Sequence, residues 1–156
     1  MGWKTHFCFF VMEILEKIVK NNLVGDIRLI DLLHDHKSDY LKITIDSLDD
    51  IPIGKTSYIA KCIKNDENLI SLFPNGFRLE VGTPGVGSEL KHSFQYKKNI
   101  GRDIALKYLK SDGASISRVF KLKGSDESGV KVENKNAELF IPYEKITSAK
   151  IKVSFD

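Results

Sequence analysis

The chain has little cysteine and no long apolar run. Its two cysteines, Cys8 and Cys62, lie far apart without any Cys-x-x-Cys spacing, which excludes a disulfide framework and a cysteine-based zinc site. No stretch approaches the roughly 20 apolar residues that span a bilayer. Charged residues also interrupt the apolar run 7–12 too early for a secretory signal. These absences predict a cytoplasmic protein in a reducing compartment, with Cys62 as a small core residue.

Charge is divided unevenly along the chain. Its 156 residues, of which 42% are hydrophobic, suffice for one ordinary domain or two small ones. Residues 1–92 hold 11 Lys/Arg and 13 Asp/Glu, whereas residues 93–156 hold 13 and 8. The asymmetry favours two surfaces with different partners: the basic half suits RNA phosphates, and the acidic half suits a basic protein.

The first half has the pattern of a small α+β domain. Apolar residues recur at helical spacing from Met12 to Leu23, which predicts an amphipathic helix. Residues 1–11 are expected to be a non-native or disordered extension, with Met12 as the natural start. A hairpin, a second helix capped by Thr56 or Ser57, and a strand complete the order αββαβ, with two helices against one face of a three-stranded sheet; they are expected over 27–34, 40–46, 56–72 and 76–82.

The second half alternates short strands with turns rich in Gly, Asp, Ser and Asn, which is typical of a compact barrel. A single helical turn is expected at 143–146 before the last strand, as in SH3-like barrels. We therefore predict an α+β domain over 12–91 and an all-β SH3-like (Sm-like) small barrel over 92–156. The barrel strands are expected at 103–109, 115–123, 130–133, 138–141 and 149–155.

The segment from Phe77 to Leu90 joins these two halves. Alternation of apolar and charged residues predicts a strand, which Thr83-Pro84-Gly85 ends because proline fixes its own φ. Glycine amides such as those of Gly85 and Gly87 can form an anion-binding nest. No helix pattern begins directly after Gly87, so a rigid hinge is favoured over a phosphate site.

This junction resembles a known family. The string Arg78-Leu79-Glu80-Val81-Gly82-Thr83-Pro84-Gly85, followed by Leu90-Lys91, is similar to the strand and loop of the bacterial ribosome maturation factor RimP family. Residues 99–104 resemble the start of the family's second domain, and 141–146 with 149–151 resemble its closing strand. The resemblance covers about 12–156.

The resemblance implies a ribosome maturation factor that binds the maturing small (30S) ribosomal subunit and assists its assembly without catalysis. It implies no cofactor and no metal. The implied partners are a decoding-region small-subunit ribosomal protein and/or 16S rRNA, with no membrane, and we expect a monomer.

Part of the junction departs from the family pattern. Gly82 and Thr83 stand where the family usually carries two small hydroxyl residues. Gly87, Ser88 and Glu89 replace an acidic residue, a basic residue and a second proline. These departures predict a looser and less positive loop.

Two further motifs suggest chemistry but favour simpler interpretations. Gly54-Lys55-Thr56 resembles the end of a P-loop, yet the position of the first glycine is Asp49, whose carboxylate would repel phosphates. A helix start is therefore favoured over a nucleotide hydrolase. His34 and His36 lie at alternate positions and could share a metal with Asp31 or Asp35, but further ligands at a recognisable spacing are missing, so an exposed polar hairpin end is favoured.

The basic residues of the second half are interleaved with aromatic residues. Some of them could line a groove against an RNA backbone, positioning the protein without reading sequence. A solvated barrel surface is the alternative, because neighbouring strand residues face opposite sides. Together with the junction, the candidate binding residues are Arg78, Glu80, Thr83, Pro84, Gly85, Ser88, Lys91, Arg102, Lys107, Arg118 and Lys121.

The sequence thus leads to a preferred hypothesis and an alternative. The preferred one is a non-enzymatic assembly factor for the small ribosomal subunit. The alternative is a stand-alone Sm/SH3-like RNA-binding module that acts outside the ribosome.

Overall fold

The chain folds into two compact units with separate hydrophobic cores. A computed structural model describes residues 2–85, 87–135 and 137–152. The units are Met1–Pro84 and Gly85–Asp156, and each contains helices and one sheet, so the predicted α+β class is confirmed. None of the described helices is both long and apolar enough to cross a membrane.

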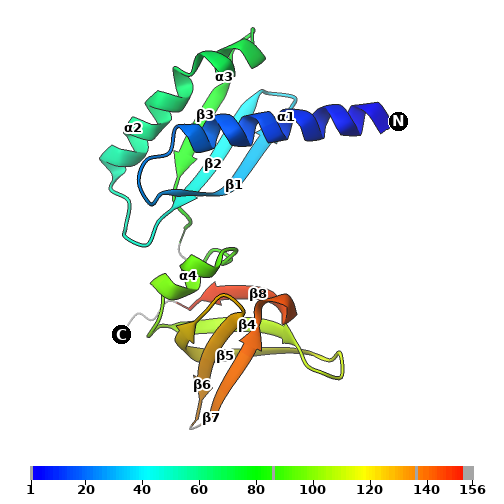
Figure 1. Cartoon of the computed structure of the whole chain (residues 1–156), viewed down its shortest axis with the longest axis vertical. Helices are drawn as coiled ribbons and strands as arrows, with labels where there is room; N and C mark the ends of the chain where they lie inside the picture. The colour runs from blue at the N-terminus through cyan, green and yellow to red at the C-terminus, as the bar shows by residue number, and fades with distance from the viewer. Residues whose placement is uncertain (1, 86, 136, 153–156) are drawn as a thin grey trace. The chain divides into compact units, whose positions relative to one another are not determined.

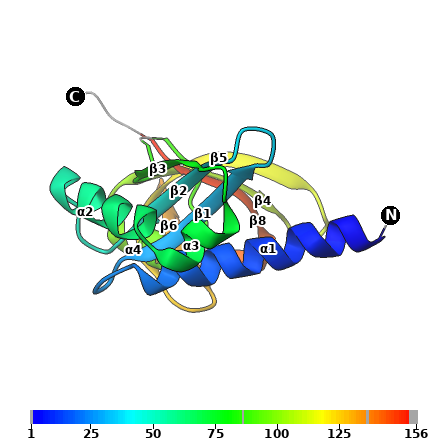
Figure 2. The ribbon, with the colours of Figure 1, turned by 90° about the horizontal axis from the view of Figure 1, so that it is seen from above.

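The first unit is a three-stranded sheet with helices on one face, as Figures 1 and 2 show. The sheet has the order β1-β2-β3, in which β1 is antiparallel and β3 parallel to β2. Its strands and helices are α1 (Gly2–Asn21), β1 (Arg28–Asp35), β2 (Tyr40–Asp46), α2 (Ile53–Lys64), α3 (Glu67–Leu72) and β3 (Arg78–Gly82).

Alternation along β2 explains which face the helices cover. Leu41, Ile43 and Ile45 are fully buried, whereas Lys42 between them is exposed. Because successive strand residues point to opposite faces, the three apolar side chains form one surface that packs against the helices. The predicted bounds of this strand are confirmed.

The helix expected over 56–72 is divided in two. The first part, α2, begins earlier than expected, directly after Pro52, and ends at Lys64. Asp66 then caps α3, because its carboxylate accepts a hydrogen bond of 2.9 Å from the backbone N–H of Asn68. The same carboxylate accepts one of 3.0 Å from Asn22 Nδ2, which ties the end of α1 to this break. The order is therefore αββααβ.

The first helix is longer than predicted. It begins at Gly2 and not at Met12. Residues 1–11 were expected to be a non-native or disordered extension; the segment is helical from residue 2, and a natural start at Met12 stays a prediction. Figure 1 shows its first turns extending past the edge of the sheet. Phe9 and Phe10 on this extension are 68% and 60% exposed.

The second unit is a five-stranded antiparallel sheet with the order β7-β6-β5-β4-β8. Among the described residues no ladder joins β7 to β8, so the expected barrel closure is not seen. The last strand begins three residues earlier than predicted, and residues 153–155 of that prediction lie outside the described residues. The elements are α4 (Ser93–Lys98), β4 (Asp103–Leu109), β5 (Ser115–Ser125), β6 (Gly129–Asn134), β7 (Ala137–Pro142), the 3-10 turn η1 (Tyr143–Lys145) and β8 (Ile146–Ile151).

A short helix, α4, was not expected from the sequence. The buried side chain of Gln95 stabilises its start by accepting hydrogen bonds from the backbone N–H of Lys91 and His92, at 2.7 and 2.9 Å. Just before it, the N–H of Leu90 donates to the carbonyl of Ala149 on β8 at 2.8 Å. This bond attaches the segment before α4 to the second sheet, and the chain therefore divides at Pro84 and not at Lys91.

Candidate functional site

The predicted residues of β3 lie on the face of the first sheet that its helices leave uncovered. Arg78 pairs with Tyr40 of β2 in the parallel ladder, and Glu80 pairs with Lys42. The guanidinium carbon of Arg78 lies 5.7 Å from the centre of the Tyr40 ring. The Tyr40 hydroxyl donates a hydrogen bond to Glu80, which raises the pKa of Tyr40. Arg78 and Glu80 are thus held in place by the same tyrosine.

The junction residues form a turn with one glycine in the left-handed region. The N–H of Ser88 donates to the carbonyl of Gly85 at 3.0 Å, and Gly87 has a φ of +79°. Thr83 and Pro84 end the first unit, and Gly85 and Ser88 begin the second. Their part in binding a partner stays a prediction.

Basic residues of the second unit divide between the two faces of its sheet. Lys107 and Lys121 lie on the outer face, opposite to the buried Ile104 and Leu106. Arg118 pairs with Leu106 and so lies on the other side. Arg102 precedes β4 and donates to Asn99 Oδ1 at 3.4 Å. Of these four predicted residues, the sheet brings only two onto one face.

Lysine 150, which the sequence analysis did not select, joins that outer face. It lies on β8 and pairs with Ala105 of β4, and Lys107 of β4 pairs with Ser148 of β8. Lys121 pairs with Asp103, four residues from Lys107 along β4, so the lysines spread over about 13 Å. We call Lys107, Lys121 and Lys150 the lysine face.

Ion pairs distinguish the lysine face from the rest of the sheet. Lys123 Nζ lies 3.0 Å from Glu133 Oε2, and Lys131 Nζ lies 3.5 Å from Glu138 Oε2. No such pair involves the lysine face within the part of the chain that the structure describes. Lys121 stands opposite Asp103 and Glu133 in its two ladders, and Lys150 stands opposite Glu89, so neighbouring carboxylates offset part of this charge. What sets the lysine face apart is that its ammonium groups are not held in close ion pairs, as those of Lys123 and Lys131 are.

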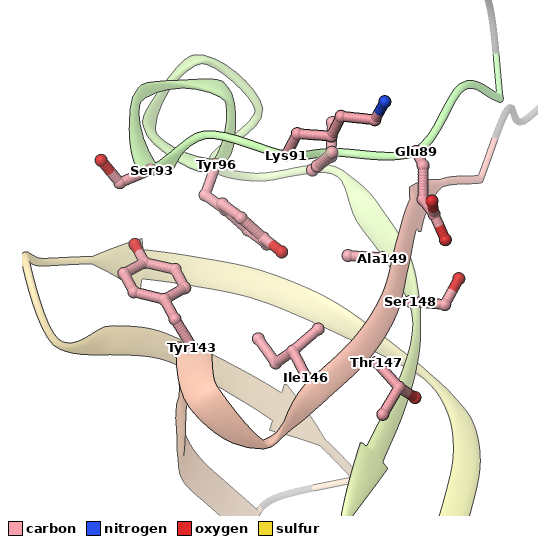
Figure 3. A pocket seen from close by; sticks show the side chains of 10 residues that line it. Glu89, Lys91, Ser93, Tyr96, Tyr143, Ile146, Thr147, Ser148 and Ala149 are labelled. Atoms are coloured by element: carbon pink, nitrogen blue, oxygen red, sulfur yellow. The ribbon is translucent and has the colours of Figure 1, made fainter. Parts of the chain in front are cut away.

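The remaining predicted residue, Lys91, borders a pocket of about 330 Å³ in the second unit (Figure 3). Two tyrosines, Tyr96 of α4 and Tyr143 of η1, form part of its wall. Their ring centres are 5.3 Å apart.

The P-loop-like string lies within a helix. Gly54-Lys55-Thr56 belongs to the first turn of α2, and the Thr56 hydroxyl donates to the carbonyl of Ile53 at 2.9 Å. The residue that caps the helix is Pro52, so the expected cap at Thr56 or Ser57 is wrong. Lys55 lines a small cavity of about 110 Å³ together with Asp49 and Asp50, whose charges disfavour a phosphate.

The rings of His34 on β1 and of His36 in the following turn are in contact, with centres 4.1 Å apart and planes tilted by 53°. The His34 side chain is only 4% exposed and packs edge-on against Phe73 at 5.3 Å, so the expectation of an exposed hairpin end is wrong for this residue. Asp39 Oδ1 lies 3.5 Å from its Nε2. No group of three or more His, Cys, Asp or Glu suited to a metal occurs among the described residues.

We expect the first unit to lose stability as the pH falls below about 6.5. Burial and the neighbouring His36 lower the pKa of His34, against the opposing effect of Asp39 and Asp35. Between the lowered pKa and the ordinary value, the unfolded chain binds a proton that the folded chain does not, so acid favours unfolding. Urea midpoints of the wild type should fall from pH 8 to pH 5.5. His34→Leu should flatten this dependence, and an unchanged slope would contradict the assignment.

Comparison with known proteins includes a match along nearly the whole chain. No protein-family model matches the chain. A ribosome maturation factor RimP from Christiangramia forsetii is 26% identical over 154 residues, covering 93% of this chain and 97% of that protein. The resemblance to the RimP family is confirmed.

The RimP match spans both units, in agreement with a resemblance expected over about 12–156. The structure adds three residues to the predicted binding residues: Lys150, Tyr96 and Tyr143. Lys150 lies within the strand predicted over 149–155, so its alternation with Ala149 and Ile151 could have placed it on the outer face. Nothing in the sequence indicated that the two tyrosine rings meet, because α4 was not predicted and η1 lies more than 40 residues away.

Proposed function

We propose that this protein is a ribosome maturation factor that binds the maturing small ribosomal subunit in the cytoplasm and acts without catalysis. The resemblance to RimP along nearly the whole chain supports the role in ribosome maturation. Binding one state of an assembling particle more tightly than another is sufficient to shift assembly toward it.

The lysine face is the observation that carries the binding part of this proposal. Three ammonium groups on one side of a sheet, none of them in a close ion pair among the described residues, suit the phosphates of 16S rRNA. Serines 117 and 148 pair with Lys107 and add hydroxyl groups to the same surface. Such contacts orient a protein on RNA without reading its sequence.

The first unit is proposed to meet a basic protein, a small-subunit ribosomal protein of the decoding region. It carries 10 Lys/Arg against 12 Asp/Glu, whereas the second carries 14 against 9. Arg78 and Glu80, fixed by Tyr40 on the uncovered sheet face, are the residues we assign to that contact, with the protein acting as a monomer.

The strand arrangement of the second unit supports a relation to SH3-like domains. Four antiparallel strands are followed along the chain by a 3-10 turn, and the fifth strand comes immediately after it, as in that fold. The proposed relation to SH3-like domains rests on this order of elements, and the described strands form an open sheet.

Removing the lysine face should weaken binding to small-subunit precursors in a salt-dependent way. In the variant Lys107→Gln/Lys121→Gln/Lys150→Gln, the slope of log affinity against log salt concentration should decrease by about 2 to 3, because each phosphate contact contributes about 0.7 to 0.9. Co-sedimentation of the full chain with precursors at graded salt measures this slope.

A control variant removes three charges elsewhere. Lys17, Lys61 and Lys64 are exposed on α1 and α2, and their replacement by Gln should leave the slope unchanged. Equal slopes for the two triple variants would overturn the role of the lysine face. Failure of the wild type to sediment with precursors in lysate of a deletion strain would overturn the proposed function itself.

The alternative is an RNA-binding module that acts outside the ribosome, which the lysine face would also serve. The two differ in selectivity. Comparable affinity of the full chain for unrelated RNAs and for small-subunit precursors at the same salt would favour the alternative.

A further inference from the structure

The first unit contains a pocket of about 230 Å³ at one end of its sheet. Helix α1 contributes Val11 to the lining, the turn after β1 contributes His36 and Asp39, and the end of α3 contributes Leu72 and Phe73. A cavity of about 150 Å³ is known to hold a benzene ring, so this pocket has room for one long side chain.

His34 of β1 also lines this pocket, and its ring lacks hydrogen bonds. The side chain is 4% exposed, and both ring nitrogens are buried without a hydrogen-bond partner in the described part of the chain. Asp39 Oδ1 is near Nε2, at 3.5 Å, but no hydrogen bond forms between them. Buried polar groups in proteins are nearly always hydrogen-bonded. An exception at the wall of a cavity therefore indicates a polar group that enters the cavity.

The polar atoms at this wall are acceptors. Burial lowers the pKa of His34, so its ring is neutral at physiological pH. The nearby Asp39 carboxylate favours the tautomer with the proton on Nε2, which leaves Nδ1 as an acceptor. The Asp39 side chain is 41% exposed, so an entering group can reach its carboxylate.

The charge of the pocket is negative. Asp39 is the acidic residue of the lining, and no lysine or arginine occurs among the described residues that line it. The other titratable residue of the lining is His36, which is exposed and whose ring contacts that of His34.

These features select among ligands. A phosphate or a carboxylate would meet the charge of Asp39 without a lysine or arginine to offset it. A purely apolar group would leave the acceptor of His34 unpartnered. An ammonium group has three donors and no acceptor, and the aliphatic stem of a lysine suits the apolar side chains of Val11 and Leu72.

We propose that this pocket binds a lysine side chain of a basic protein segment. The ammonium group donates to the Asp39 carboxylate. It also donates to His34 Nδ1, which a change of rotamer of the exposed His36 opens to it. The site lies on the side of the sheet that the helices cover, apart from Arg78 and Glu80, and it does not depend on the proposed function.

The test uses two short peptides that differ in the charge of one side chain. Acetyl-Gly-Lys-Gly-amide and its analogue with Nε-acetyl-lysine, which is neutral, are titrated into the full-length ¹⁵N-labelled protein at neutral pH and low salt. With the lysine peptide we expect saturable shifts of the backbone amides of His34, Asp39, Leu72 and Asn75, which line the pocket. The affinity for the acetyl-lysine peptide should be about tenfold lower.

Two variants locate the interaction. Asp39→Asn should abolish the preference for lysine over acetyl-lysine, and asparagine tolerates the φ of +49° at this position. Asp35→Asn is the matched control, because Asp35 lies four residues away and outside the described lining, so the preference should remain. An asparagine oxygen there can still accept the hydrogen bond from the backbone N–H of Lys37.

Several outcomes would overturn the proposal. They are equal affinities of the two peptides, a preference that survives Asp39→Asn, a preference that both variants lose, and shifts confined to residues outside the pocket. Tighter binding of the corresponding glutamate peptide at the same amides would also overturn it. Co-sedimentation with small-subunit precursors is a separate readout and tests only the proposed function.

Discussion

The variant Leu122→Ala should destabilise the second unit by about 2–5 kcal/mol. Leu122 is fully buried at the centre of β5, and its neighbours include Val132, Ile104 and Phe120. Truncation removes the transfer free energy of the leucine side chain and leaves a cavity that a sheet fixed on both sides cannot close. Because native stability is commonly only 5–15 kcal/mol, much of the unit's stability would be lost. Amide hydrogen exchange of β4, β5 and β6 in the full chain measures this directly.

An exposed residue on the same strand provides the control. Val119 is 44% exposed on the outer face. Val119→Ala should change the free energy of unfolding obtained from amide exchange by less than about 0.5 kcal/mol. If both variants raised exchange equally, the second core would not be centred on Leu122.

The variant Gly129→Ala should destabilise the same unit by about 1–3 kcal/mol, although it adds a single methyl group. A Cβ at Gly129 would lie 2.7 Å from the Phe140 ring, 2.9 Å from Pro142 Cα and against the carbonyl oxygen of Ile141. Two of these three neighbours are backbone atoms of the paired strand β7, so relief requires a shift of the β6–β7 ladder. Thermal unfolding of the purified chain should show a clear loss of stability.

Another glycine of the sheet shows whether the effect comes from crowding. At Gly124 on β5 an added Cβ would meet only Lys131 Cβ at 3.9 Å, an ordinary contact, and its φ is not positive. Gly124→Ala should therefore change the melting temperature much less than Gly129→Ala. A reversed order would show that the ladder at Gly129 yields easily.

Glycine 129 also accounts for an exposed aromatic residue. Phe140 is 48% exposed on the edge strand β7, and its ring lies over the position where Gly129 lacks a side chain. An aromatic ring that covers a cross-strand glycine compensates for the missing side-chain packing. Phe140 therefore has a structural reason to stand on the surface.

Strands with one buried face were predicted well from the sequence. The bounds of β2 and β4 are those expected, because alternation of apolar and polar residues continues to the strand ends and turn residues follow at once. The resemblance to RimP was likewise recognised from short stretches of sequence, and the match to a RimP protein covers nearly the whole chain.

Helices were predicted less well, for reasons that are local but easily overlooked. The break before α3 depends on the Asp66 carboxylate, which has one partner in the next turn and another in Asn22, directly after α1. The helix α4 has six residues and lacks a full amphipathic repeat, and the buried amide of Gln95 stabilises its start. A periodicity argument needs more turns than these helices provide.

Composition, alternation and the junction motif were sufficient to give the α+β class, the acidic and basic halves and the likeness to RimP, because each depends on residues close together in the chain. Strand pairing assigned Lys107, Lys121 and Lys150 to one face and Arg118 to the other, and between the described strands it does not close the sheet into a barrel. Folding also joined Glu89, Tyr96 and Tyr143 in one pocket. Such arrangements follow from register and from contacts across more than 40 residues, which no local pattern specifies.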